Sequence, residues 1–127
     1  MADVNRGNRP LSPHLQIYRL PLVAKISIMT RITGVGMMAG GILVVWWFVA
    51  GAYSPDYFAV ADALLTSWFG LLVLVGSLWA LWFHFANGIR HFFFDLGKGF
   101  DLPTVARSNW YVIGASVVLT VLTLMLV

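Results

Sequence analysis

The sequence predicts an all-α membrane protein with three transmembrane helices. The chain has 127 residues, of which 60% are hydrophobic and only 10% charged, and its mean hydropathy is +0.84. A soluble globular domain usually has about 25% charged residues, so these values lie well outside that class. Three apolar stretches are each long enough to cross a bilayer, which leaves no length for a separate soluble domain.

The N-terminal residues 1–23 are expected to form a cytoplasmic arm ahead of a transmembrane domain at 24–127. The arm has neither the apolar run and small-residue cleavage site of a secretory signal nor the amphipathic, serine- and arginine-rich pattern of a transit peptide. Within it, Ser12 followed by Pro13 predicts the start of a short interfacial helix, which Pro21 ends.

The first span is predicted at residues 24–52. Its outer end carries Trp46, Trp47 and Tyr53, residue types that settle at headgroup level. The segment GAYSPDYFAVAD then predicts a turn, because Pro55 interrupts the helix.

The second span is predicted at residues 64–94, which is longer than the hydrocarbon requires, so we expect this helix to tilt or protrude. The polar segment DLGKGFDLPTVARSN closes it with glycine and proline. The third span, at residues 110–127, contains no ionisable side chain and is expected to serve packing and lipid contact.

The basic residues predict the orientation. All eight Lys and Arg lie before or within the start of the first span, or at and beyond the end of the second: Arg6, Arg9, Arg19, Lys25, Arg31, Arg90, Lys98 and Arg107. The positive-inside rule therefore places the N-terminus and the 95–109 loop in the cytoplasm, or in a mitochondrial matrix. We favour the bacterial inner membrane, because the chain begins at Met1 without a transit segment, and we expect no nucleic-acid partner.

Cysteine is absent, which excludes disulfides and an iron–sulfur cluster ligated by this chain alone. Any redox cofactor must be held by other side chains, and histidine is the obvious candidate.

Polar residues form a stripe on the second span. At 100° per residue, His84, Gly88, His91 and Asp95 project within about 40° of His84, and Ser77 falls on the same side. An uncompensated charge at mid-membrane costs on the order of 3 kcal/mol, so such a stripe faces protein, a cavity or a cofactor.

The members of this stripe differ in depth. His91, Asp95 and the neighbouring Arg90 lie near the headgroups, where an interfacial role is favoured, and Arg90 is expected to snorkel. His84 lies about 15 Å of helical rise before Asp95, within the hydrocarbon. It could bond a neighbouring helix or ligate a cofactor, two alternatives that the residue alone does not separate.

A buried neutral imidazole beside a small residue such as Gly88 suits haem iron. His84 and His91 lie about 10 Å apart along one face, so they cannot clamp the two sides of one macrocycle. A six-coordinate haem would need its second histidine from another chain, which predicts a heteromeric membrane unit.

The first span has a similar stripe, formed by Ser27, Arg31, Gly34 and Gly41. Gly36 and Gly40 form a small-xxx-small pair suited to close helix packing. Arg31 is either a snorkelling flanking residue or a group that binds a haem propionate or a quinone head group, with the Ser27 hydroxyl as a second donor.

Three motifs occur in order along the chain. They are RPLSPHLQIYRLP at residues 9–21, Ser-x-x-x-Arg-x-x-Gly beginning at Ser27, and His-x-x-x-Gly-Ile-Arg-His beginning at His84 and followed by Asp95. Together they resemble the cytochrome b membrane anchor of succinate dehydrogenase, the subunit usually labelled C, over nearly the whole chain.

This resemblance implies roles for individual residues. His84 corresponds to an axial ligand of haem b, and the companion anchor supplies the other histidine. Ser27 and Arg31 correspond to the ubiquinone site, with Arg31 also near a haem propionate, while His91 has a weaker propionate-side or structural role. Thr30 departs from the family, which commonly has histidine there, so a contact made by that histidine is in doubt.

The resemblance also implies the partners. The three helices would form half of a heterodimeric helix bundle with a second anchor subunit, on which an iron–sulfur subunit and a flavoprotein subunit dock. No flavin or iron–sulfur site is expected on this chain. The alternatives are the anchor of a fumarate reductase, or a haem-free structural anchor.

Overall fold

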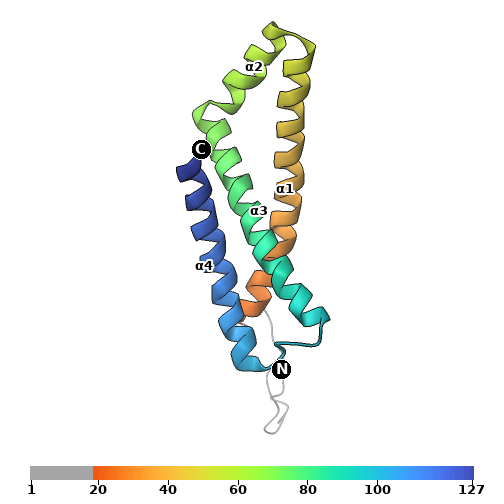
Figure 1. Cartoon of the computed structure of the whole chain (residues 1–127), viewed down its shortest axis with the longest axis vertical. Coiled ribbons are helices and arrows are strands. Elements are labelled where there is room, and N and C mark those ends of the chain that lie inside the picture. Colours follow the sequence, from red (N-terminus) through yellow and green to blue (C-terminus); the bar gives the residue numbers. More distant parts are fainter. Residues whose placement is uncertain (1–18) are drawn as a thin grey trace, which may run out of the picture.

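The structure is a computed structural model that describes residues 19–127, and this part of the chain is helical without strands (Figure 1). Its helices are α1 (Leu22–Tyr53), α2 (Pro55–Leu65), α3 (Trp68–Asp95) and α4 (Leu102–Leu126). Helices α1, α3 and α4 are long and apolar enough to cross a membrane. The predicted all-α membrane fold with three spans is thus confirmed, whereas the helix start predicted at Ser12 lies outside the described residues.

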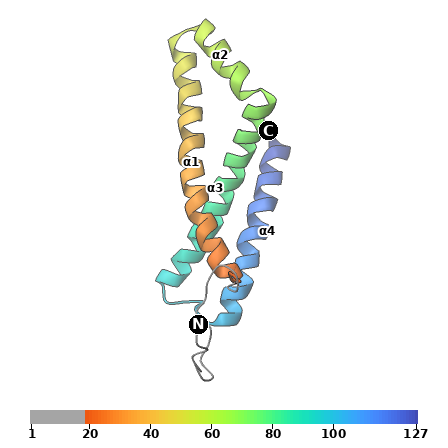
Figure 2. The same cartoon turned by 180° about the vertical axis from the view of Figure 1, so that it is seen from behind.

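Helix α3 is the central element, packed against α1 on one side and α4 on the other. It crosses α1 and runs antiparallel to α4, so the C-terminus lies near the start of α3 (Figures 1 and 2). The start of α1 and the connection at residues 96–101 lie at one end of the molecule, and α2 lies at the other. The six described basic residues belong to the first end, which we call the basic end.

The turn predicted after the first span is in fact helix α2. Pro55 occupies the first turn of this helix, where its missing N–H is no loss. Ser54 caps α2, because its Oγ accepts a hydrogen bond from the N–H of Tyr57 at 3.2 Å. Ser67 caps α3 in the same manner at Gly70, so α3 begins at Trp68, later than the predicted residue 64.

Tryptophans at the outer end of α1 bind α2. Trp46 Nε1 donates to the hydroxyl of Tyr57 at 2.7 Å, and Trp47 Nε1 donates to Asp62 Oδ1 at 3.1 Å. The Trp47 ring also packs against Phe58, with their centroids 5.2 Å apart. The two tryptophans therefore hold α2 as well as supplying the aromatic character expected at headgroup level.

Helix α4 begins at Leu102, eight residues before the predicted third span. Gly97 and Gly99 have φ values of 72° and 81°, a left-handed conformation that glycine adopts without strain. Asp101 then caps α4, since its Oδ2 accepts from the N–H of Thr104 at 3.0 Å. Hydrogen bonds from the side chain and the backbone of Thr104 lower the pKa of Asp101.

The core is small, and α1, α3 and α4 each contribute to it. Ile26, Phe83 and Val112 are buried together. Farther along the α1–α3 contact, a Cβ added to Gly40 would collide with Ser77 Oγ and lie 2.7 Å from Ser77 Cβ, whereas one added to Gly36 would meet nothing within 4 Å. Only Gly40 of the predicted glycine pair therefore serves close packing within the described chain, and large apolar side chains cover much of the outer surface.

Candidate functional site

The predicted polar stripes of α1 and α3 meet at Gly34 and His84. A Cβ added to Gly34 would lie 3.4 Å from Cε1 and 3.8 Å from Nδ1 of the His84 ring. Gly34 therefore lets the imidazole lie directly on the backbone of α1, and a larger residue there would press on the ring.

His84 has an unsatisfied ring nitrogen. The side chain is half-buried, and Nδ1 is buried without a hydrogen-bond partner in the described chain. Buried polar atoms are normally paired, so an orphan of this kind calls for an explanation such as a missing ligand or partner. Gly88, one turn later, is exposed, and a Cβ added there would meet nothing within 4 Å.

Most of the remaining members of both stripes are exposed on the described chain. At the basic end these are Ser27, Arg31, His91 and Asp95, while Gly41 is exposed farther along α1 and Ser77 is half-buried against Gly40. Because the helices are antiparallel and Gly34 meets His84, Arg31 lies at about the depth of Gly88, and Ser27 at about the depth of His91. We call the four exposed residues at the basic end, together with His84 and Gly88, the open face.

A second polar group, which the sequence did not predict, lies on other sides of the same helices. Asn87 of α3 is fully buried, and its Nδ2 donates to Thr30 Oγ1 of α1 at 2.8 Å. The Thr30 hydroxyl in turn donates to the carbonyl of Ile26 at 2.8 Å. Thr30, at the position where the resemblance predicts histidine, thus has a structural partner within this chain.

Arg90 continues this group toward α4. Its Nε donates to Ser108 Oγ at 2.9 Å and its Nη1 donates to Asn87 Oδ1 at 3.3 Å, while its guanidinium carbon lies 4.8 Å from the centre of the Phe94 ring. Only 8% of Arg90 is exposed, so the predicted snorkelling is wrong. Arg90 lies about 120° around α3 from the His84 direction, and its Nε is bonded to Ser108. We call Thr30, Asn87, Arg90 and Ser108 the buried polar chain.

The described residues do not contain a cluster suited to a bare metal ion. No group of three or more His, Cys, Asp or Glu side chains between residues 19 and 127 could hold one. A metal at His84 would thus need most of its donors from elsewhere, as haem iron has from its macrocycle.

Comparison with known proteins assigns the family. Residues 5–123 match the model of the succinate dehydrogenase/fumarate reductase transmembrane subunit. The chain belongs to this family. The family predicted from the three motifs is therefore confirmed.

The curated relatives extend over nearly the full chain. The succinate dehydrogenase cytochrome b556 subunit of Paracoccus denitrificans is 57% identical over 124 residues, covering 98% of this chain and 95% of that protein. The cytochrome b556 subunit of Rickettsia conorii is 38% identical, covering 91% and 90%. The mitochondrial cytochrome b560 subunit of Sus scrofa is 36% identical, covering 92% of this chain and 68% of that protein.

Proposed function

We propose that this chain is the cytochrome b anchor of a succinate:quinone oxidoreductase in a bacterial inner membrane. In this proposal it binds haem b together with a second anchor subunit and forms part of the ubiquinone reduction site. The observation that carries the proposal is the half-buried imidazole of His84, which lies against Gly34 and beside the exposed Gly88, and whose buried Nδ1 has no hydrogen-bond partner in the described chain.

The residues around His84 fit a haem. The imidazole is half-buried, its position is fixed by contact with Gly34, and Gly88 adds no side chain beside it. His84 would hold the iron through one ring nitrogen, and the N–H of the other nitrogen would donate a hydrogen bond to an acceptor. The bound haem supplies a one-electron redox centre. Because the described chain offers a single histidine at this depth, the partner anchor would supply the other histidine that holds the iron.

Ser27 and Arg31 are proposed to bind the ubiquinone head group. Both are exposed on the described chain and lie one to two turns nearer the basic end than Gly34. The Ser27 hydroxyl would donate a hydrogen bond to a quinone carbonyl, and the Arg31 guanidinium would stabilise the negative charge that develops on reduction. Arg31 or His91 would also be available to a haem propionate.

The partners follow from the same proposal. Succinate would be oxidised on a flavoprotein subunit, and electrons would reach the membrane through an iron–sulfur subunit. Both would dock at the basic end, on the cytoplasmic side by the positive-inside rule. Fumarate reductase is the second candidate because the family description includes it. Succinate dehydrogenase is preferred because the relatives above carry that name.

The test is a reduced-minus-oxidised absorption spectrum of the purified complex. We expect wild type to show a b-type band and His84→Leu to lose or shift it. His91→Leu is the matched control, since it removes a histidine two turns away on the same face, and it should keep the band. A wild-type complex without the band would instead support a haem-free anchor, and an unchanged band in His84→Leu would exclude this ligand.

A further inference from the structure

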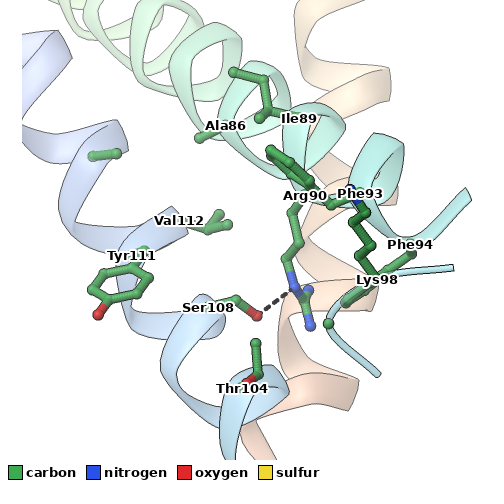
Figure 3. Close-up of a pocket in the computed structure, with 12 residues that line it drawn as sticks. Ala86, Ile89, Arg90, Phe93, Phe94, Lys98, Thr104, Ser108, Tyr111 and Val112 are labelled. Atoms are coloured by element: carbon green, nitrogen blue, oxygen red, sulfur yellow. Dashed lines mark hydrogen bonds between the residues drawn. The ribbon is translucent and has the colours of Figure 1, made fainter. Parts of the chain in front are cut away.

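A cavity outside the open face lies between α3 and α4 at the basic end. Its volume is about 420 Å³, and most of its wall is apolar, from residues such as Ala86, Ile89, Phe93, Val112 and Ala115. Apart from Tyr111, its polar residues lie toward the 96–101 connection: Arg90, Lys98, Thr104 and Ser108 (Figure 3). The cavity thus has a long apolar part and a short cationic part.

The charge of Arg90 is not neutralised within the described chain. Its partners are neutral, namely Ser108, Asn87 and the Phe94 ring, and its Nη2 is buried without a hydrogen-bond partner. Lys98 adds a second cation at the cavity, and none of the lining residues is acidic. These two uncompensated cations favour an anion at this end of the cavity.

The shape of the cavity indicates what carries the anion. The lining residues on α4 extend from Thr104 to Ala115, which corresponds to about 16 Å along the helix axis. This distance runs from the connection, at headgroup level, into the apolar span. A lipid has matching parts, a phosphate for the cationic end and an acyl chain for the apolar part, whereas a peptide carboxylate would fill only the cationic end.

We propose that this cavity is a binding site for an anionic phospholipid of the cytoplasmic leaflet, with the phosphate beside Arg90 and Lys98 and an acyl chain along Ala86, Val112 and Ala115. Basic pockets between transmembrane helices on the cytoplasmic side bind such headgroups in general. The site is separate from the open face, so the inference does not depend on the haem or quinone assignments.

The experiment measures retention of spin-labelled phosphatidylglycerol and phosphatidylcholine by the purified complex in detergent. We expect phosphatidylglycerol to be held preferentially and Lys98→Gln to weaken this preference about fivefold. Arg107→Gln is the matched control, because it removes an exposed charge near the start of α4 that does not line the cavity. It should change retention little.

A second variant tests the apolar part without touching a charge or a hydrogen bond. Ala115→Phe should fill the groove and reduce retention, and circular dichroism of the complex would verify that α4 remains folded. Inorganic phosphate added at millimolar concentration should not displace the lipid, because it lacks the acyl chain.

Equal retention of both lipids would overturn the proposal, as would equal losses in Lys98→Gln and Arg107→Gln. Loss of the iron–sulfur subunit from Lys98→Gln with lipid retained would assign the site to a protein carboxylate instead.

Discussion

The open face and the buried polar chain lie at the same depth and share α1 and α3, with Ser108 of α4 joining only the second, yet the described chain satisfies their polar groups to different degrees. In the buried polar chain, Thr30, Asn87 and Ser108 have partners within the chain, and Arg90 has two partners there, with only its Nη2 left without one in the described chain. On the open face, Nδ1 of His84 has none, and Ser27 and Arg31 are exposed. Polar groups in a membrane are costly unless they are satisfied. The difference therefore separates groups that hold these helices together from groups that are available to a cofactor, a substrate or another subunit.

Asn87→Leu should have the largest effect on stability. It removes the hydrogen-bond donor to Thr30 and the acceptor for Arg90. The buried guanidinium of Arg90 would then have one hydrogen bond fewer. We expect a loss of about 2–3 kcal/mol, measured as a lower midpoint for thermal dissociation of the complex.

Asn87→Leu also tests the contrast between the two regions. The fraction that remains assembled should keep its b-type spectrum, because His84 is unchanged. A lost spectrum with unaltered stability would mean that Asn87 belongs to the functional set.

Arg31→Leu should instead reduce activity with little change in stability, because Arg31 is exposed and the described chain does not need it for packing. Loss of a hydrogen bond to a developing charge corresponds to about tenfold or more in quinone reduction, and Ser27→Ala should cost less. Succinate oxidation with an artificial acceptor is the internal control and should be spared. Equal losses in the two assays would argue against a quinone site at these residues.

Gly40→Ala tests the contact between α1 and α3 on its own. The added methyl group would collide with Ser77, so we expect destabilisation of about 1–2 kcal/mol from overpacking. Gly36→Ala is the control within this chain, since its methyl group would meet nothing within 4 Å. Combining Gly40→Ala with Ser77→Gly should restore stability, and failure of this rescue would show that the strain lies elsewhere.

Thr30→Val should have the smallest effect, because it keeps the shape of the side chain and removes one hydroxyl. Loss of its hydrogen bond with Asn87 predicts about 1 kcal/mol of destabilisation, read from the same thermal midpoint. Haem content and quinone reduction should stay at wild-type levels. A selective fall in haem content would transfer Thr30 from the structural group to the functional one.

The three spans and both stripes were predictable because hydropathy and helical periodicity are properties of the sequence alone. Helix α2 was missed because proline within an apolar stretch usually indicates a helix end. Here Pro55 directly follows the N-cap Ser54 and occupies the first helical position, where proline is tolerated. The early start of α4 was missed because residues 102–109 contain Pro103 and four polar side chains, and the cap at Asp101 outweighs that composition.

The role of Arg90 was missed for a different reason. Periodicity places Arg90 on α3 but does not reveal which neighbour covers that side, and α4 proves to present Ser108 there. Asn87 carried the one available signal, since an amide in a spanning helix needs a partner. That this partner is Thr30 depends on the register between α1 and α3, which the sequence alone does not reveal.

The central claim is that His84 is a ligand and not a packing residue, and chemical rescue tests it most directly. In the complex carrying His84→Gly, the b-type band should be lost or shifted. Exogenous imidazole should restore it, since Gly34 and Gly88 leave space for the free ring. His91→Gly, the matched control, should keep the band both before and after imidazole is added. A wild-type band in His84→Gly before imidazole is added would contradict the account.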